Sequence, residues 1–105
     1  MENLALFARL EAKPGKEKEV ADILRSALAI VQEERGTTTW YAVRLGPTTF
    51  GIFDAFPDES GRQAHMTGQV VDALNANAAL FAKPPQIDKL DILASKSAQP
   101  GTKAA

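Results

Sequence analysis

Hydrophobic and polar residues alternate over residues 4–11, near the start of the chain. One side of the extended chain carries Leu4, Leu6, Ala8 and Leu10, and the other carries Ala5, Phe7, Arg9 and Glu11. A period of two residues indicates a β-strand, here with one apolar face and one mixed face. The sequence KPG at residues 13–15 ends the strand, because proline and glycine interrupt regular structure.

The hydrophobic period lengthens over residues 16–34. Apolar side chains recur three and four residues apart, at Val20, Ile23, Leu24, Ala27, Leu28 and Val31. This spacing predicts an amphipathic helix, and Gly36 is a natural C-terminal stop for it.

β-Branched and aromatic residues mark two further strands, at residues 37–45 and 50–56, which the turn sequence GPTT joins into a hairpin. The register is open at this level. Trp40 lies opposite either Ala55 or Asp54, and a slip by one residue exchanges the two faces of the strand.

A second helical region starts after Pro57, with Asp58 as its N-cap, and Gly68 divides it. Its second part turns Val70, Leu74 and Phe81 inward, and a last strand follows at residues 87–94. This order of elements predicts an α+β, ferredoxin-like βαββαβ fold, with one antiparallel sheet and both helices on one side. We expect the domain to span residues 1–95, and the polar residues 96–105 are typical of a C-terminal tail.

The second face of such a sheet needs a cover, because two helices occupy only the first. At this chain length the simplest cover is a second copy of the same sheet, related by a two-fold axis. We therefore predict a homodimer whose two protomers pack their sheets into a dimeric α/β barrel.

Composition narrows the function classes. A chain of 105 residues with 45% hydrophobic and 24% charged residues is an ordinary globular domain, and a net charge of -1 argues against nucleic-acid or anionic-membrane partners. With no cysteine and one histidine, the chain lacks the ligands of thiolate zinc or iron–sulfur sites, and we expect no metal. The sequence shows no signal peptide or membrane span, so we expect a cytoplasmic location.

The single histidine, His65, lies between two glycines in the second helical region. A helical projection places Gly61, Ala64, His65 and Gly68 on the inward face, with Arg62 and Met66 on or beside the outward one. Two interpretations of His65 are open. In the first, it borders a pocket and binds a ligand there, since it is the one side chain on this face that titrates near neutral pH. In the second, it is a buried histidine whose ring hydrogen-bonds to a backbone carbonyl.

Aromatic side chains and one carboxylate complete the candidate residues. Five aromatic residues could line a pocket for a flat apolar molecule, and they could equally fill the core and a dimer interface. They are Phe7, Trp40, Tyr41, Phe56 and Phe81. Trp40 and Tyr41 point to opposite faces, so only one of them faces the helices. Asp54, in the middle of a strand, is either a buried base or the partner of Arg9 or Arg44.

The segments PGKEKEVADILRSAL and TTTWYAVRLGPTTFGIFDAFPDESGRQAHMTGQVV together resemble the antibiotic biosynthesis monooxygenase domain family. The resemblance runs from the first strand to the last. It implies a dimeric α+β barrel with a pocket between sheet and helices, and oxidation of phenols or quinols by O2 without metal or flavin. His65 matches the family's common helix histidine and would be the catalytic acid or base, with Trp40 or Tyr41 and Phe56 packing the substrate.

Related branches of this family degrade haem with an asparagine, a tryptophan and an axial histidine. The aligned positions here are Ala8, Phe56 and Asn75, so the resemblance argues against haem degradation. Three readings stay open: a monooxygenase for a small phenol, quinol or polyketide-like aromatic; a non-catalytic dimeric protein that binds a small ligand; and a scaffold whose pocket is filled by its own side chains.

Overall fold

One four-stranded antiparallel sheet organises the chain. The structure is a computed structural model and describes residues 2–96. Its elements are β1 (Leu4–Glu11), α1 (Glu17–Val31), β2 (Thr39–Arg44), β3 (Thr49–Phe56), α2 (Glu59–Met66), α3 (Gln69–Ala76), a 3-10 turn (Ala78–Leu80) and β4 (Gln86–Asp91). The strand order is β2-β3-β1-β4 with antiparallel neighbours, which confirms the predicted ferredoxin-like α+β fold.

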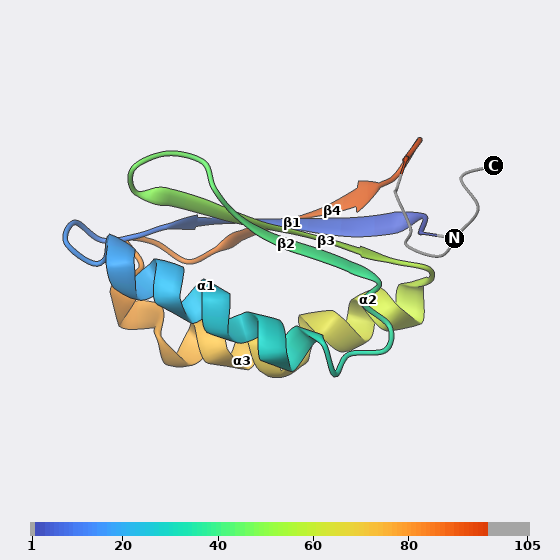
Figure 1. Cartoon of the computed structure of the whole chain (residues 1–105), viewed down its shortest axis with the longest axis horizontal. Coiled ribbons are helices and arrows are strands. Elements are labelled where there is room, and N and C mark those ends of the chain that lie inside the picture. The colour runs from blue at the N-terminus through green and yellow to red at the C-terminus, as the bar shows by residue number, and fades with distance from the viewer. Residues whose placement is uncertain (1, 97–105) are drawn as a thin grey trace.

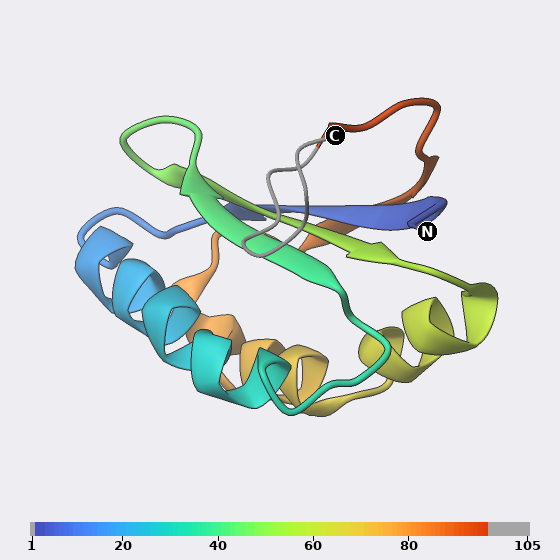
Figure 2. The same cartoon turned by 45° about the vertical axis from the view of Figure 1, so that its right-hand side comes forward.

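All three α-helices lie on the same side of the sheet (Figures 1 and 2). The leucine face of β1 points toward them, since Leu10 pairs with Phe50 and both join the core around Val20 and Leu24 of α1. Burying a side chain of this size stabilises the fold by about 2 kcal/mol. The predicted faces of β1 and α1 therefore close on each other and form the core.

The hairpin adopts the second of the two possible registers. Trp40 lies opposite Asp54, because the turn closes with the Leu45 N–H donating to the Thr49 carbonyl at 2.8 Å. Directly opposite residues share a face, so Trp40 and Asp54 both point toward the helices. Tyr41 points the other way and is 60% exposed.

The sheet face away from the helices, which we call the open face, carries Phe7, Tyr41, Val43 and Phe53. Among the described residues, Tyr41 and Val43 are exposed on it. The Phe7 ring packs on Gly51, where a Cβ atom would come within 2.9 Å of the ring. The uncovered face is thus the mixed side of β1.

Helix α2 begins as expected but is rotated relative to the projection. Asp58 accepts a hydrogen bond from the Gly61 N–H at 2.9 Å, which confirms the N-cap. The inward positions are Gly61, Arg62 and His65, whereas Ala64 is exposed. The placement of Arg62 and Ala64 from the projection was therefore wrong.

Arg62 is buried because its guanidinium pairs with the Glu59 carboxylate at 2.5 Å and also reaches backbone acceptors. Its guanidinium donates to the carbonyls of Ala5 and Leu90, at 3.3 and 3.4 Å. A charged group that finds such partners can be buried at low cost. A helical projection that sorts residues only by polarity misses this arrangement.

Within residues 2–96, no helix is both long and apolar enough to cross a membrane. The expected tail at residues 96–105 lies, apart from Lys96, outside the described residues.

Candidate functional site

Three ionisable side chains from distant segments, two of them buried and Glu34 half-buried, form a row that we call the ionic chain. His65 of α2 places Nε2 at 2.8 Å from Oδ2 of Asp54 on β3. Its Nδ1 lies 2.6 Å from Oε1 of Glu34, in the turn after α1. His65 and Asp54 are 6% and 2% exposed. The partners of His65 are therefore two carboxylates rather than a backbone carbonyl, and the partner of Asp54 is His65 rather than Arg9 or Arg44.

Two glycines bring Glu34 to His65. Gly36, in the turn after α1, packs on Gly61 of α2, and a Cβ atom on Gly61 would lie 2.7 Å from the Gly36 carbonyl oxygen. Only bare backbone allows this approach. The absence of a side chain at Gly61 thus allows close contact with the turn after α1, which brings Glu34 to His65.

The two carboxylates hold a proton on His65. Burial by itself lowers the pKa of His65, but the hydrogen bonds to Asp54 and Glu34 outweigh it and raise the pKa from 6.5 to about 9. At neutral pH the ring is an imidazolium that donates both N–H groups. Burial raises the pKa of Asp54, and its hydrogen bond to His65 offsets part of that rise.

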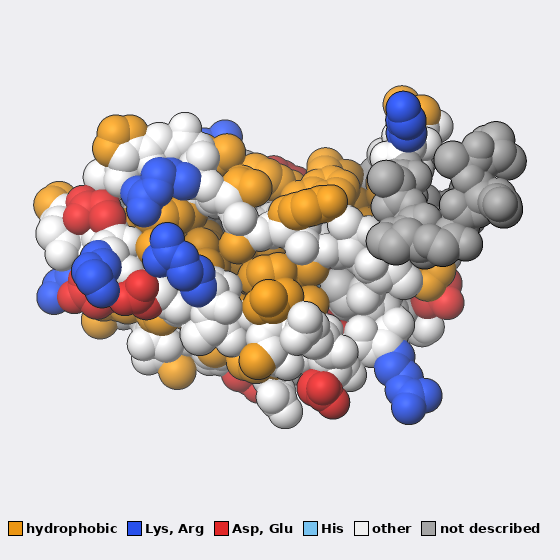
Figure 3. Space-filling model, viewed as in Figure 1, with side chains coloured by type: hydrophobic (Ala, Val, Ile, Leu, Met, Phe, Trp, Pro, Cys, Tyr) orange, Lys and Arg blue, Asp and Glu red, His pale blue; other side chains and the backbone are white. Residues whose placement is uncertain are grey.

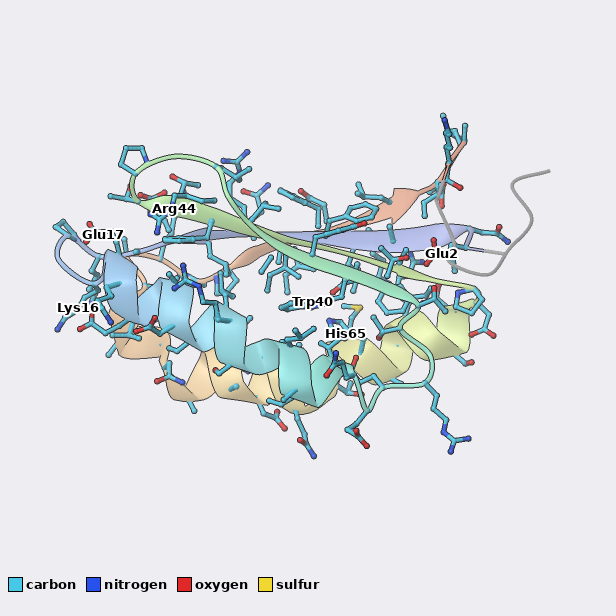
Figure 4. All side chains as sticks on the ribbon, viewed as in Figure 1. Glu2, Lys16, Glu17, Trp40, Arg44 and His65 are labelled. Atoms are coloured by element: carbon cyan, nitrogen blue, oxygen red, sulfur yellow. The ribbon has the colours of Figure 1, made fainter. Side chains whose placement is uncertain are left out.

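Two buried polar atoms beside the ionic chain have no hydrogen-bond partner within residues 2–96: the Trp40 Nε1 and the Asp54 Oδ1. We call them the polar pair. They come from residues directly opposite each other on β2 and β3. One is a donor and the other an acceptor, and a buried polar group without a partner costs about 1–3 kcal/mol. Figure 4 shows that Trp40 and His65 both lie between the sheet and the helices.

Trp40 and Asp54 each line a cavity, and the two cavities are different ones. On the Asp54 and His65 side, a cavity of about 30 Å³ has walls from Leu6, Met66 and Val70, which is room for one or two water molecules. On the Trp40 side, a cavity of about 350 Å³ lies between α1 and β2. We call the larger one the edge cavity. Its volume is that of a site for a single aromatic ring.

The structure brings some of the predicted aromatic residues to this region and separates others. Trp40 lines the edge cavity, and the Phe56 ring lies 5.5 Å from the His65 ring. Phe7 and Tyr41 belong to the open face, away from His65. Phe81 packs in the core near Leu10.

The ionic chain does not converge on one point. Asp54 and Glu34 contact opposite nitrogens of the imidazole, so their oxygens face different sides of the ring. Among residues 2–96, no group of three acidic or histidine side chains has an arrangement that would hold a metal ion.

Sequence reasoning missed Glu34 and understated Asp54. Glu34 is the last residue of the predicted helix and one of several charged residues in a polar stretch there, with the sequence ERG at residues 34–36. The signal that could have found it is the glycine two positions later, which matches Gly61 as a second site of close backbone contact.

The fold and this site define a ferredoxin-like α+β protein with an acid–imidazole row between sheet and helices. Solved structures share this fold. A protein of unknown function from Nitrosomonas europaea is 57% identical, with 94% of this chain and 97% of that chain covered and a TM-score of 0.91. No protein-family model matches the chain, and no curated protein matches it.

Two more distant structures are both named "putative antibiotic biosynthesis monooxygenase". The one from Caulobacter crescentus is 18% identical, with 89% of this chain and 92% of that chain covered and a TM-score of 0.76. The one from Nitrosomonas europaea is 15% identical, with 90% and 94% covered and a TM-score of 0.78. The chain belongs to the same family as the 57% identical protein. Its fold is that of the antibiotic biosynthesis monooxygenase domains, as the resemblance implied.

Proposed function

We propose that this protein is a cofactor-independent monooxygenase that oxidises a small phenol or quinol with O2, and that the aromatic hydroxyl binds between Trp40 and Asp54. The observation that carries the proposal is the polar pair. A hydroxyl group bound between them would satisfy both atoms, because its hydrogen would be donated to the carboxylate and its oxygen would accept from the indole N–H. The shared fold supports the same reaction class by analogy.

In this proposal Asp54, rather than His65, is the catalytic residue that faces the substrate. Burial raises the pKa of Asp54, which makes its carboxylate a stronger base toward a phenol, whose own pKa is about 10. His65 is a positioning residue: it holds the Asp54 Oδ2 atom at 2.8 Å and leaves Oδ1 for the guest. Glu34 fixes the other side of the ring.

The electrons for O2 come from the substrate. Once Asp54 has taken the phenolic proton, a ring carbon of the phenolate forms a bond to one oxygen atom of O2. The O–O bond then breaks as the hydrogen on that carbon leaves as a proton, and the carbon becomes a quinone carbonyl. The second oxygen atom leaves as water with the phenolic and ring protons, so the ring loses four electrons and O2 gains four. The apolar side chains of Leu6, Val70 and Leu74 around the smaller cavity keep bulk water away from Asp54.

Oxygen uptake with a panel of phenols and hydroquinones tests the proposal. We expect uptake with the parent protein, a loss of roughly 100-fold or more in Asp54→Asn, which removes the base, and a smaller loss in His65→Gln. Asp72→Asn, on an exposed position of α3, is the matched control and keeps full activity. Uptake that is absent for every phenol, or unchanged in Asp54→Asn, refutes the proposal.

A second candidate is a non-catalytic protein that binds the same small aromatic guest. One observation favours it: the imidazole is 6% exposed, both its nitrogens are occupied, and the cavity beside it is about 30 Å³. This candidate predicts that phenols raise the melting temperature by mass action while no oxygen is consumed. Turnover by the parent protein rules it out.

We also propose that the open face is the interface of a homodimer. The exposed apolar side chains of Tyr41 and Val43 lie beside Phe7 and Phe53 on this face, and an apolar patch of this kind favours a partner. In sedimentation experiments at micromolar concentration we expect a dimer for the parent and a monomer for Tyr41→Asp. Leu28→Asp, an exposed apolar position on α1, is the control and stays dimeric. A monomeric parent contradicts the proposal.

A further inference from the structure

The edge cavity combines apolar walls with two guanidinium groups. Its walls come from Ala21, Leu24 and Leu28 of α1 and from Trp40 and Ala42 of β2, with Phe50 behind them. The charged residues that line it are Arg25 and Arg44. In Figure 3, hydrophobic side chains gather in the hollow between the sheet and α1, with Lys or Arg side chains beside them.

Arg44 is held in place beside the cavity. Its guanidinium stacks over the Phe50 ring, 4.6 Å from the centroid, and one N–H group donates to the Pro47 carbonyl at 3.2 Å. A guanidinium has five N–H donors, so several remain for a ligand. Figure 4 places Arg44 on the hairpin above α1.

Arg25 reaches the same cavity from α1 and has one weak partner. Its guanidinium lies 3.3 Å from Asp22, which is closer to Lys18, at 2.9 Å. All three side chains are exposed, and such pairs contribute little to stability. A bound anion can therefore replace Asp22 on Arg25 while Asp22 keeps Lys18.

From these contacts we infer that the edge cavity binds small aromatic carboxylates, with the ring against Trp40 and the carboxylate on Arg25 and Arg44. A guanidinium binds a carboxylate through two parallel hydrogen bonds, and the apolar walls accept a flat ring. This inference deepens the proposed function, because it implies that the preferred phenol substrate carries a carboxylate on its ring. It rests on the proposed function only in treating the bound molecule as a substrate.

Calorimetric titration of the full chain with benzoate, benzyl alcohol and inorganic phosphate tests the inference. We expect benzoate to bind, benzyl alcohol to bind roughly 10-fold more weakly, and phosphate to bind more weakly than benzoate, because one charged hydrogen-bond pair corresponds to about a factor of ten. Arg44→Gln and Arg25→Gln should each weaken benzoate binding to a similar extent. Arg9→Gln, on the open face, is the matched control and should leave the affinity unchanged.

Three results overturn the inference: benzyl alcohol that binds as tightly as benzoate, phosphate that binds as tightly as benzoate, or arginine variants that bind benzoate like the parent. Oxygen uptake separates this inference from the proposed function. Benzoate binding that depends on Arg25 and Arg44, without uptake for any phenol, refutes the oxygenase alone. Uptake with neutral hydroquinones, without benzoate binding, refutes the carboxylate site alone.

Discussion

Raising the pH from 6 to 9.5 should destabilise the protein through His65. Its pKa rises from 6.5 to about 9 on folding, so the folded chain holds a proton that the unfolded chain releases. The stabilisation is complete below pH 6.5 and is lost as the pH rises through 9. At about 1.4 kcal/mol per pH unit, the free energy of unfolding falls by about 3 kcal/mol over this interval.

Urea denaturation at a series of pH values measures this loss, with Trp40, the only tryptophan, as the fluorescence probe. For a slope of about 1–3 kcal/mol per molar urea, the midpoint moves down by roughly 1–3 M. Protein concentration stays fixed, because dimerisation also contributes to stability. His65→Gln is the control, since glutamine does not titrate, and its midpoint should change little over the same interval.

The proton on His65 can also be followed directly. The chain has one histidine, so its imidazole C–H signals in an NMR pH titration are unambiguous. We expect a midpoint near 9. A midpoint at or below 6.5, or equal pH slopes of stability in the parent and His65→Gln, would show that the ionic chain does not hold the ring as an imidazolium.

Two further predictions concern the local structure that supports the ionic chain. Gly61→Ala introduces a Cβ atom 2.7 Å from the Gly36 carbonyl oxygen and should lower the free energy of unfolding by about 1–3 kcal/mol. It should also lower the pKa of His65, because Glu34 moves away. Gly46→Ala is the control and should change neither quantity, since no atom lies within 4 Å of that position among the described residues. Asp58→Ala removes the N-cap of α2 and should lower the melting temperature at pH 7. Asp58→Asn should lower it less, because asparagine keeps a capping oxygen. Equal losses in these two variants would contradict the capping role.

The element order could be predicted from sequence because the hydrophobic period changes along the chain. Alternation at residues 4–11 and a helical repeat at residues 16–34 each correspond to an observed element. The hairpin register could not be predicted, because the turn GPTT permits two loop lengths. That register decides whether Trp40 or Tyr41 faces the helices, and with it the composition of the candidate site.

The ionic chain lies beyond sequence reasoning for a different reason. Asp54, His65 and Glu34 come from a strand, a helix and a turn that meet only after the sheet and helices have packed. A pattern read along one element shows which face a residue takes, but not which distant residue it meets. Arg62 illustrates the same limit, since its burial depends on carbonyl groups from two strands.

The most direct test of the central claim is the response of the single Trp40 indole N–H signal to aromatic guests in the absence of O2. Phenol donates and accepts hydrogen bonds, whereas anisole, of similar shape, cannot donate to Asp54. If the polar pair binds a hydroxyl group, phenol moves the indole signal downfield and binds more tightly than anisole, and Asp54→Asn reduces the difference. An indole signal that stays in place with phenol, or moves equally with both guests, contradicts the claim.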